Sequence, residues 1–122
     1  MGSFPDNWTQ KSSNAMTALA RHTVELAEEE PETWFNPTHF TTEVCYRPDK
    51  VFPPTGIQGC WEIRCQYGPK DREWTFFRQD MSNAVQQLRD CWGESIWRGH
   101  FDSGMVYEFV KRLNISAETH NY

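Results

Sequence analysis

The sequence predicts an α+β fold: an antiparallel sheet of four to five strands with two helices packed on one face, in the order α-βββ-α-ββ. Two observations predict this class. Apolar residues recur every three to four positions in two segments, which is typical of amphipathic helices. They alternate with polar residues in several shorter segments, which is typical of half-buried strands. The 122 residues suit a single domain, and an aromatic content of 15% excludes a largely disordered chain.

The first helix is expected over residues 12–30. Its apolar stripe consists of Met16, Leu19, Ala20, Thr23, Val24 and Ala27. Ser12 or Ser13 can cap the N-terminus of this helix, and Pro31 would end it. The two ends of the chain, residues 1–11 and 114–122, are expected to be flexible segments.

Three strands are expected next, over residues 38–46, 57–67 and 72–78, and the last two of these would form a hairpin. Residues 47–56 hold three prolines and predict a loop. Alternation in the second strand assigns Ile57, Trp61, Ile63, Cys65 and Tyr67 to the core face and Cys60, Glu62 and Arg64 to the polar face.

The period then returns to that of a helix over residues 80–92, with Asp80 as its N-cap and Gly93 ending it. Two more strands are predicted over residues 95–101 and 105–110, on either side of a turn. Residues 105–113 could instead form a helix, and the pattern does not decide between the two.

The four cysteines predict two disulfides, because none of them has the close spacing of a zinc-ligand pair. Cys65 is expected on the core face of its strand, below the helix that carries Cys91. Cys45 and Cys60 are expected on the outer face of neighbouring strands. Face parity therefore pairs Cys65 with Cys91 and Cys45 with Cys60, provided that the Cα atoms of each pair lie ~4.4–6.8 Å apart.

Two N-glycosylation sequons begin at Asn7 and Asn114. The first residues contain no apolar leader, so the chain is either cytoplasmic or a mature secreted domain whose signal has been removed. Together with the cysteines, the sequons favour a secreted, extracellular glycoprotein.

The formal net charge of −5 argues against a protein that grips nucleic acid. No apolar run reaches the ~18–20 residues of a membrane span. The sequence contains no nucleotide fingerprint, nucleophile elbow or zinc-protease motif, and we expect no metal and no cofactor.

One set of titratable residues suits RNA cleavage, which needs a base for the 2′-hydroxyl, an acid for the leaving oxygen and a cation for the phosphorane. The set consists of His39, Glu62, Arg72 and His100. These residues lie in four short sequence segments: Pro37-Thr38-His39-Phe40, Cys60-Trp61-Glu62-Ile63, Asp71-Arg72 and Gly99-His100-Phe101.

In these segments the chain resembles the small microbial guanyl-specific ribonucleases, which carry His, Glu, Arg and His in this order along their strands. The resemblance implies Glu62 as the base, His100 as the acid, His39 as an electrostatic or second base, and Arg72 or Arg64 as the phosphate ligand. The chain departs from that family in the helix at residues 80–92, which interrupts the sheet, and in lacking a glycine-rich loop. Glu62 and Arg64 could equally form an ion pair on a solvated strand face.

In size, acidity, aromatic content and cysteine number the chain also resembles secreted fungal effectors and killer-toxin-like proteins. This favours a non-enzymatic, secreted interaction protein whose partner is a protein or a glycan. Its working surface would be the polar sheet face and the loops near Trp34 and residues 47–55, with Trp34, Arg47 and Arg64 as binding residues. A carbohydrate-binding module is a third possibility, in which exposed Trp rings stack on sugars. Its candidate rings are Trp8, Trp34, Trp92 and Trp97.

Overall fold

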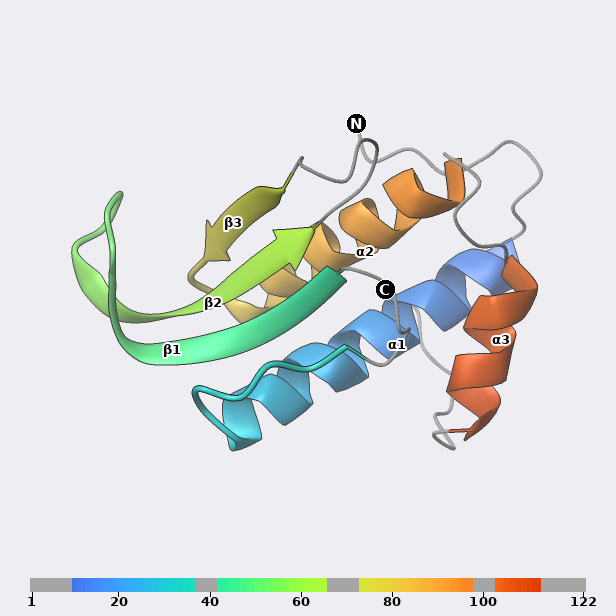
Figure 1. The fold of residues 1–122 in the computed structure, drawn as a ribbon, viewed down its shortest axis with the longest axis horizontal. Coiled ribbons are helices and arrows are strands. Elements are labelled where there is room, and N and C mark those ends of the chain that lie inside the picture. The colour runs from blue at the N-terminus through green and yellow to red at the C-terminus, as the bar shows by residue number, and fades with distance from the viewer. Residues whose placement is uncertain (1–9, 37–41, 66–72, 98–102, 113–122) are drawn as a thin grey trace.

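A computed structural model describes residues 10–36, 42–65, 73–97 and 103–112 of the chain. Over these residues it contains one three-stranded antiparallel sheet and three helices (Figure 1). The elements are α1 (Gln10–Glu29), β1 (Thr42–Phe52), β2 (Ile57–Cys65), β3 (Trp74–Arg78), α2 (Met81–Trp97) and α3 (Ser103–Arg112). The α+β class is therefore confirmed, whereas the predicted four to five strands and their order are not.

Helix α1 packs against β1, α2 and α3. Every residue of its predicted apolar stripe, from Met16 to Ala27, is at most 1% exposed. The helix ends at Glu29, two residues before Pro31, as expected. The helix begins at Gln10, so Ser12 and Ser13, the predicted caps, lie inside it. Residues 10–11, which were expected to belong to the flexible N-terminal segment, are part of the helix. The remaining residues of both predicted flexible ends, 1–9 and 114–122, lie outside the described part of the chain.

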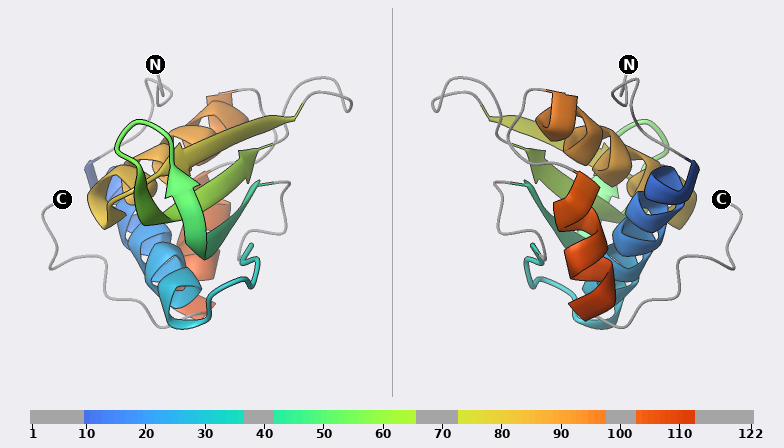
Figure 2. Two further views of the ribbon diagram at one scale, coloured as in Figure 1. Left: turned by 90° about the vertical axis from the view of Figure 1, so that its left-hand side faces the viewer. Right: turned by 90° about the vertical axis from the view of Figure 1, so that its right-hand side faces the viewer.

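The sheet has the strand order β1-β2-β3, and helices cover one of its faces (Figure 2). Val44, Trp61 and Ile63 point from the strands into the core, as alternation predicts. The indole Nε1 of Trp61 donates a hydrogen bond to the carbonyl of Val24, 3.2 Å away, which ties β2 to α1. Residues 38–41 and 66–72, which include the predicted starts of two strands, lie outside the described residues.

β1 continues well beyond the point where the prolines predict a loop, and only residues 53–56 form the turn. The β1–β2 register is regular up to the Arg47–Cys60 pair and shifts before the Val51–Gln58 pair. Pro48 lies in this irregular stretch, where a residue without a backbone N–H is tolerated. The two strands bend strongly here, and their shared end projects past the helices (Figure 1).

The prediction of a second hairpin over residues 95–110 is wrong. α2 continues through Gly93 to Trp97, and residues 103–112 form α3. Gly93 is buried and lacks the positive φ of a helix-ending glycine. In α3, Val106, Phe109 and Val110 follow helical spacing and bury one face. The alternative, a helix over residues 105–113, is therefore observed as far as Arg112. Residues 98–102 and 113 lie outside the described residues.

A disulfide joins the sheet to α2. Cys65 and Cys91 are bonded, with their Cα atoms 6.3 Å apart, as face parity predicts. Asp80 caps α2 as predicted, since its Oδ1 accepts a hydrogen bond from the backbone N–H of Asn83 at 2.8 Å. Among the described helices none is both long and apolar enough to span a bilayer.

Gly59 permits the bend of the hairpin, and we expect Gly59→Ala to destabilise the fold more than Gly56→Ala. Both glycines have positive φ, 103° and 72°, so both alanines incur a backbone cost of about 1–2 kcal/mol. A Cβ at Gly59 would also lie 2.7 Å from Oη of Tyr46, whereas one at Gly56 meets nothing within 4 Å. Urea unfolding should therefore separate the two variants by about 1–3 kcal/mol.

Tyr46→Phe supplies the matching rescue, because it removes the oxygen that the new methyl group would meet. The Gly59→Ala, Tyr46→Phe double variant should recover most of the difference from Gly56→Ala. Equal stability of the two single alanine variants would contradict this account of the bend.

Candidate functional site

The face of the sheet that points away from the helices carries alternate residues of β1 and β2. These are Glu43, Cys45, Arg47, Cys60, Glu62 and Arg64. The sequence predicts a solvated polar face here, yet Cys45 and Cys60 are at most 1% exposed and Glu62 is 5% exposed. These three residues of the outer face are therefore buried, and one of them is a carboxylate.

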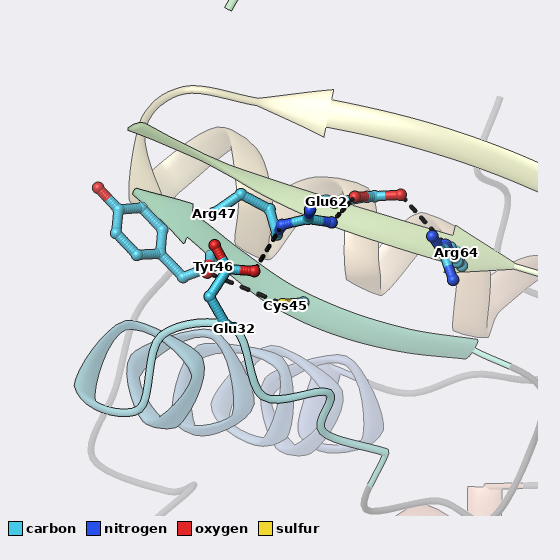
Figure 3. Close-up of polar contacts among 6 residues, drawn as sticks. All are labelled: Glu32, Cys45, Tyr46, Arg47, Glu62 and Arg64. Carbon is cyan, nitrogen blue, oxygen red and sulfur yellow. Dashed lines mark hydrogen bonds and ion pairs between the residues drawn. The ribbon is translucent and has the colours of Figure 1, made fainter. Parts of the chain in front are cut away.

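Glu62 is held between two arginines (Figure 3). Nη1 of Arg47 donates to its Oε1 at 2.7 Å, and Nε of Arg64 donates to its Oε2 at 3.1 Å. On the other side of Arg47, Oε1 of Glu32 lies 2.8 Å from Nε in an ion pair without hydrogen-bond alignment. The two arginines supply the compensation that a buried carboxylate needs.

The segment after α1 brings Glu32 to this cluster by running beside β1. The backbone N–H of Glu32 donates to the carbonyl of Tyr46 at 2.9 Å, and Phe35 forms a two-way bridge with Val44. Glu32 has φ of 65°, a conformation that few non-glycine residues adopt. One residue before the bridge, the ring of Trp34 lies 4.3 Å from the guanidinium carbon of Arg64. The segment thus covers part of the outer face.

The end of the β1–β2 hairpin contacts β3 and the residue that follows it. Nζ of Lys50 lies 4.8 Å from the ring centre of Phe77 in β3. The hydroxyl of Thr55, in the turn, donates to Oε1 of Gln79 at 3.1 Å. Despite these contacts, Val51 is 47% exposed and Ile57 is 58% exposed. Ile57 is therefore not part of the core, because the strands extend past the helices that would cover it.

The predicted Cys45–Cys60 disulfide is not present, and both thiols are free. They share the outer face as expected, but the register places Cys45 opposite Glu62 and Cys60 opposite Arg47. The two cysteines are thus diagonal neighbours, and such positions lie ~7–8 Å apart, beyond the usual span of a disulfide. Burial raises the pKa of both thiols, although nearby cations, Arg47 for Cys45 and Lys50 for Cys60, oppose the effect.

Three of the four residues proposed for RNA cleavage, His39, Arg72 and His100, lie outside the described residues. The fourth, Glu62, has each carboxylate oxygen bonded to a guanidinium and is almost inaccessible to solvent. Such a carboxylate orients two arginines and stabilises the strand pair. A general base must instead reach a substrate hydroxyl within hydrogen-bond distance.

The rings proposed for sugar stacking are not gathered on one surface. Trp92 is fully buried in the core, and Trp34 is half-buried against Arg64. Trp8 and the side chain of Trp97 lie outside the description. Trp74 in β3, which the sequence analysis did not single out, is 43% exposed.

The structure also adds residues that sequence reasoning missed. Glu32 and Lys50 are brought to the outer face by contacts between segments that are distant in the sequence. No local sequence pattern predicts these contacts. Within the described ranges, no group of three or more His, Cys, Asp or Glu side chains is arranged to hold a metal ion. Comparison of the chain with known protein families, with curated proteins and with solved structures found no match.

We expect Arg47→Met to destabilise the protein by about 3 kcal/mol, because it removes one partner of a buried carboxylate. Arg112→Met is the matched control, since it deletes an exposed arginine on α3 that lies over Phe109. The control should change the free energy of unfolding by no more than about 0.5 kcal/mol. Similar losses for both variants in urea unfolding would show that Arg47 does not stabilise Glu62.

The buried thiols should react slowly with an aromatic disulfide reagent at pH 8 while the protein is folded, because the raised pKa of Cys45 and Cys60 keeps them protonated. After unfolding without reductant, two thiols should react, and all four should react after reduction. Stability should fall as pH rises through the ordinary thiol pKa of ~8.5, because the unfolded chain then releases protons that the folded chain keeps. Finding no reactive thiol after unfolding would instead demonstrate a second disulfide.

Proposed function

We propose that this chain is a secreted, disulfide-stabilised interaction protein of the effector or toxin type, which binds a protein partner through the end of the β1–β2 hairpin. The observation that carries the proposal is the exposure of Val51 and Ile57, at 47% and 58%, on one projecting hairpin. Pro53 and Pro54 in the turn between them are exposed as well. Val51 pairs with Gln58 and Phe52 with Ile57, so the side chains of Val51 and Ile57 point to opposite faces of the hairpin end. Apolar side chains exposed on both faces of one projecting element favour a partner that contacts the end of that element.

The hairpin end is preorganised for binding. Its turn is bonded to Gln79 through Thr55, and Lys50 stacks on Phe77. At its base, the Arg47–Glu62 pair joins the two strands. A binding element that is already ordered loses less conformational entropy on association.

Trp34, Arg47 and Arg64, which the sequence suggests as binding residues, support the hairpin in this proposal. Trp34, Arg47 and Arg64 contact one another or Glu62, and they cover the outer face. We assign them the support of the hairpin, with the partner contacting Val51, Ile57 and the turn. A polar outer face that is already filled has little left to offer a partner.

Secretion is supported by the Cys65–Cys91 disulfide, because disulfides persist in oxidising compartments. The sequons at Asn7 and Asn114 agree with it, although both lie outside the described residues. The resemblance to secreted effectors in size, acidity and cysteine number supports the class.

The test compares Ile57→Asp with Trp74→Asp, which places the same charge at an exposed apolar position on another strand. A partner is first identified by photo-cross-linking from position 51, and its affinity is then measured with purified protein. Ile57→Asp should raise Kd at least about tenfold, since burial of such a side chain contributes about 1.5–3 kcal/mol. Trp74→Asp should change Kd by less than about twofold.

Both variants must first show wild-type unfolding curves. Equal binding by the two variants would remove the hairpin from the interface. Cross-linking to a glycan alone, with no protein partner, would favour the carbohydrate-binding alternative over the one proposed.

A further inference from the structure

The two free thiols of the chain lie on one face of the β1–β2 pair. All four cysteines are among the described residues, and Cys65 is bonded to Cys91, so the free thiols are those of Cys45 and Cys60. Both residues are at most 1% exposed. Sγ of Cys45 has one weak contact, with the carbonyl of Tyr46 at 3.8 Å, and no described residue forms a hydrogen bond with the thiol of Cys60. The lone pairs of both sulfurs are therefore available to a ligand.

The strand register sets the distance between the two cysteines. Cys45 is paired with Glu62 and Cys60 with Arg47, so the thiols belong to diagonal neighbours whose Cα atoms lie ~7–8 Å apart. A disulfide spans ~4.4–6.8 Å between Cα atoms, because its sulfurs are only ~2.05 Å apart. A metal ion held in line between two thiolates separates the sulfurs by ~4.6 Å, given metal–sulfur bonds of ~2.3 Å. A linear metal bridge therefore spans ~7–9 Å between Cα atoms, which fits the diagonal pair.

The charges around the thiols suit an anionic complex. Five charged side chains act on one or both thiols: Arg47, Arg64, Lys50, Glu32 and Glu62. Three of these are cations and two are carboxylates, so the set carries one net positive charge. A monovalent metal ion bound by two thiolates carries one negative charge, which makes the buried cluster neutral as a whole. Burial of charge is tolerated when the charges are compensated in this way.

We propose that Cys45 and Cys60 together bind one Cu(I) ion as a two-coordinate bis-thiolate. Thiolates are soft ligands that select Cu(I), and two of them in line suffice for this ion, whereas Zn2+ takes four ligands. Within the described ranges, no group of three or more His, Cys, Asp or Glu side chains offers a larger ligand set. This site departs from the expectation of no metal, which rested on the sequence spacing of the cysteines.

Binding replaces two thiol protons with one ion. Two S–H bonds break, two Cu–S bonds form, both protons pass to solvent, and the copper keeps its oxidation state. The side chain of Arg47 is 33% exposed and that of Glu32 is 52% exposed, so rotation of these surface side chains admits the ion while the strands stay paired. The complex joins β1 to β2 at the base of the hairpin. It does not depend on the function proposed for the hairpin end.

The test is a titration without oxygen, in which the protein competes for Cu(I) with the coloured chelator bicinchoninate. The wild type should bind one Cu(I) per chain with a Kd of about 1 nM or tighter. Cys45→Ser and Cys60→Ser should each raise Kd at least about 100-fold, because a single thiolate remains. Glu43→Gln is the matched control, since Glu43 lies on the same face but acts on neither thiol, and it should change Kd by less than about threefold.

Each variant must first show the wild-type circular dichroism spectrum, and alanine replaces a serine that prevents folding. X-ray absorption at the copper edge needs no variant, and the wild-type complex should show sulfur ligands alone, at ~2.2–2.3 Å. Any of four results would overturn the proposal: no binding by the wild type, equal binding by the wild type and both serine variants, nitrogen or oxygen ligands in the copper spectrum, or tighter binding of Zn2+ than of Cu(I).

Discussion

The burial of one carboxylate constrains the whole outer half of this structure. Glu62 is almost inaccessible, so its charge must be compensated by cations that lie close and in the correct direction. Arg47 satisfies this from β1 and Arg64 from β2 itself. Arg47 in turn engages Glu32, and Arg64 stacks on Trp34, so the segment after α1 is drawn along β1. The contacts of this one charge thus join β1 to β2 and join the segment after α1 to the same face.

The two faces of the sheet are stabilised by different physics. The inner face is apolar and packs on α1 and α2, with the Cys65–Cys91 disulfide as a covalent tie between β2 and α2. The outer face is too small and too polar to form such a core, so ion pairs and cation–π contacts cover it. The buried thiols of Cys45 and Cys60 lie on the same outer face. In the described sheet, large apolar side chains remain exposed at the hairpin end, at Val51 and Ile57, and at Trp74 in β3.

This division also sets the surroundings of Glu62 apart from those of the hairpin end. Glu62 resembles a catalytic carboxylate in sequence, since it lies on a strand near an arginine. In the fold, each of its oxygens is paired with a guanidinium group, and the carboxylate orients both arginines. The hairpin end, by contrast, combines the exposure of Val51 and Ile57 with contacts that hold it to β3 and Gln79.

The sequence by itself determined the elements whose periodicity is strong and local. The stripe of α1 from Met16 to Ala27, the core face of β2 at Trp61 and Ile63, the cap at Asp80 and the Cys65–Cys91 pairing all follow from helical or alternating spacing. The tertiary structure decided what spacing leaves open. Residues 105–110 are apolar at almost every position, so only packing against α1 selects helix over strand. The burial of Glu62 was equally undetermined, because a residue's face follows from its own strand, whereas what covers that face comes from segments far away in the chain.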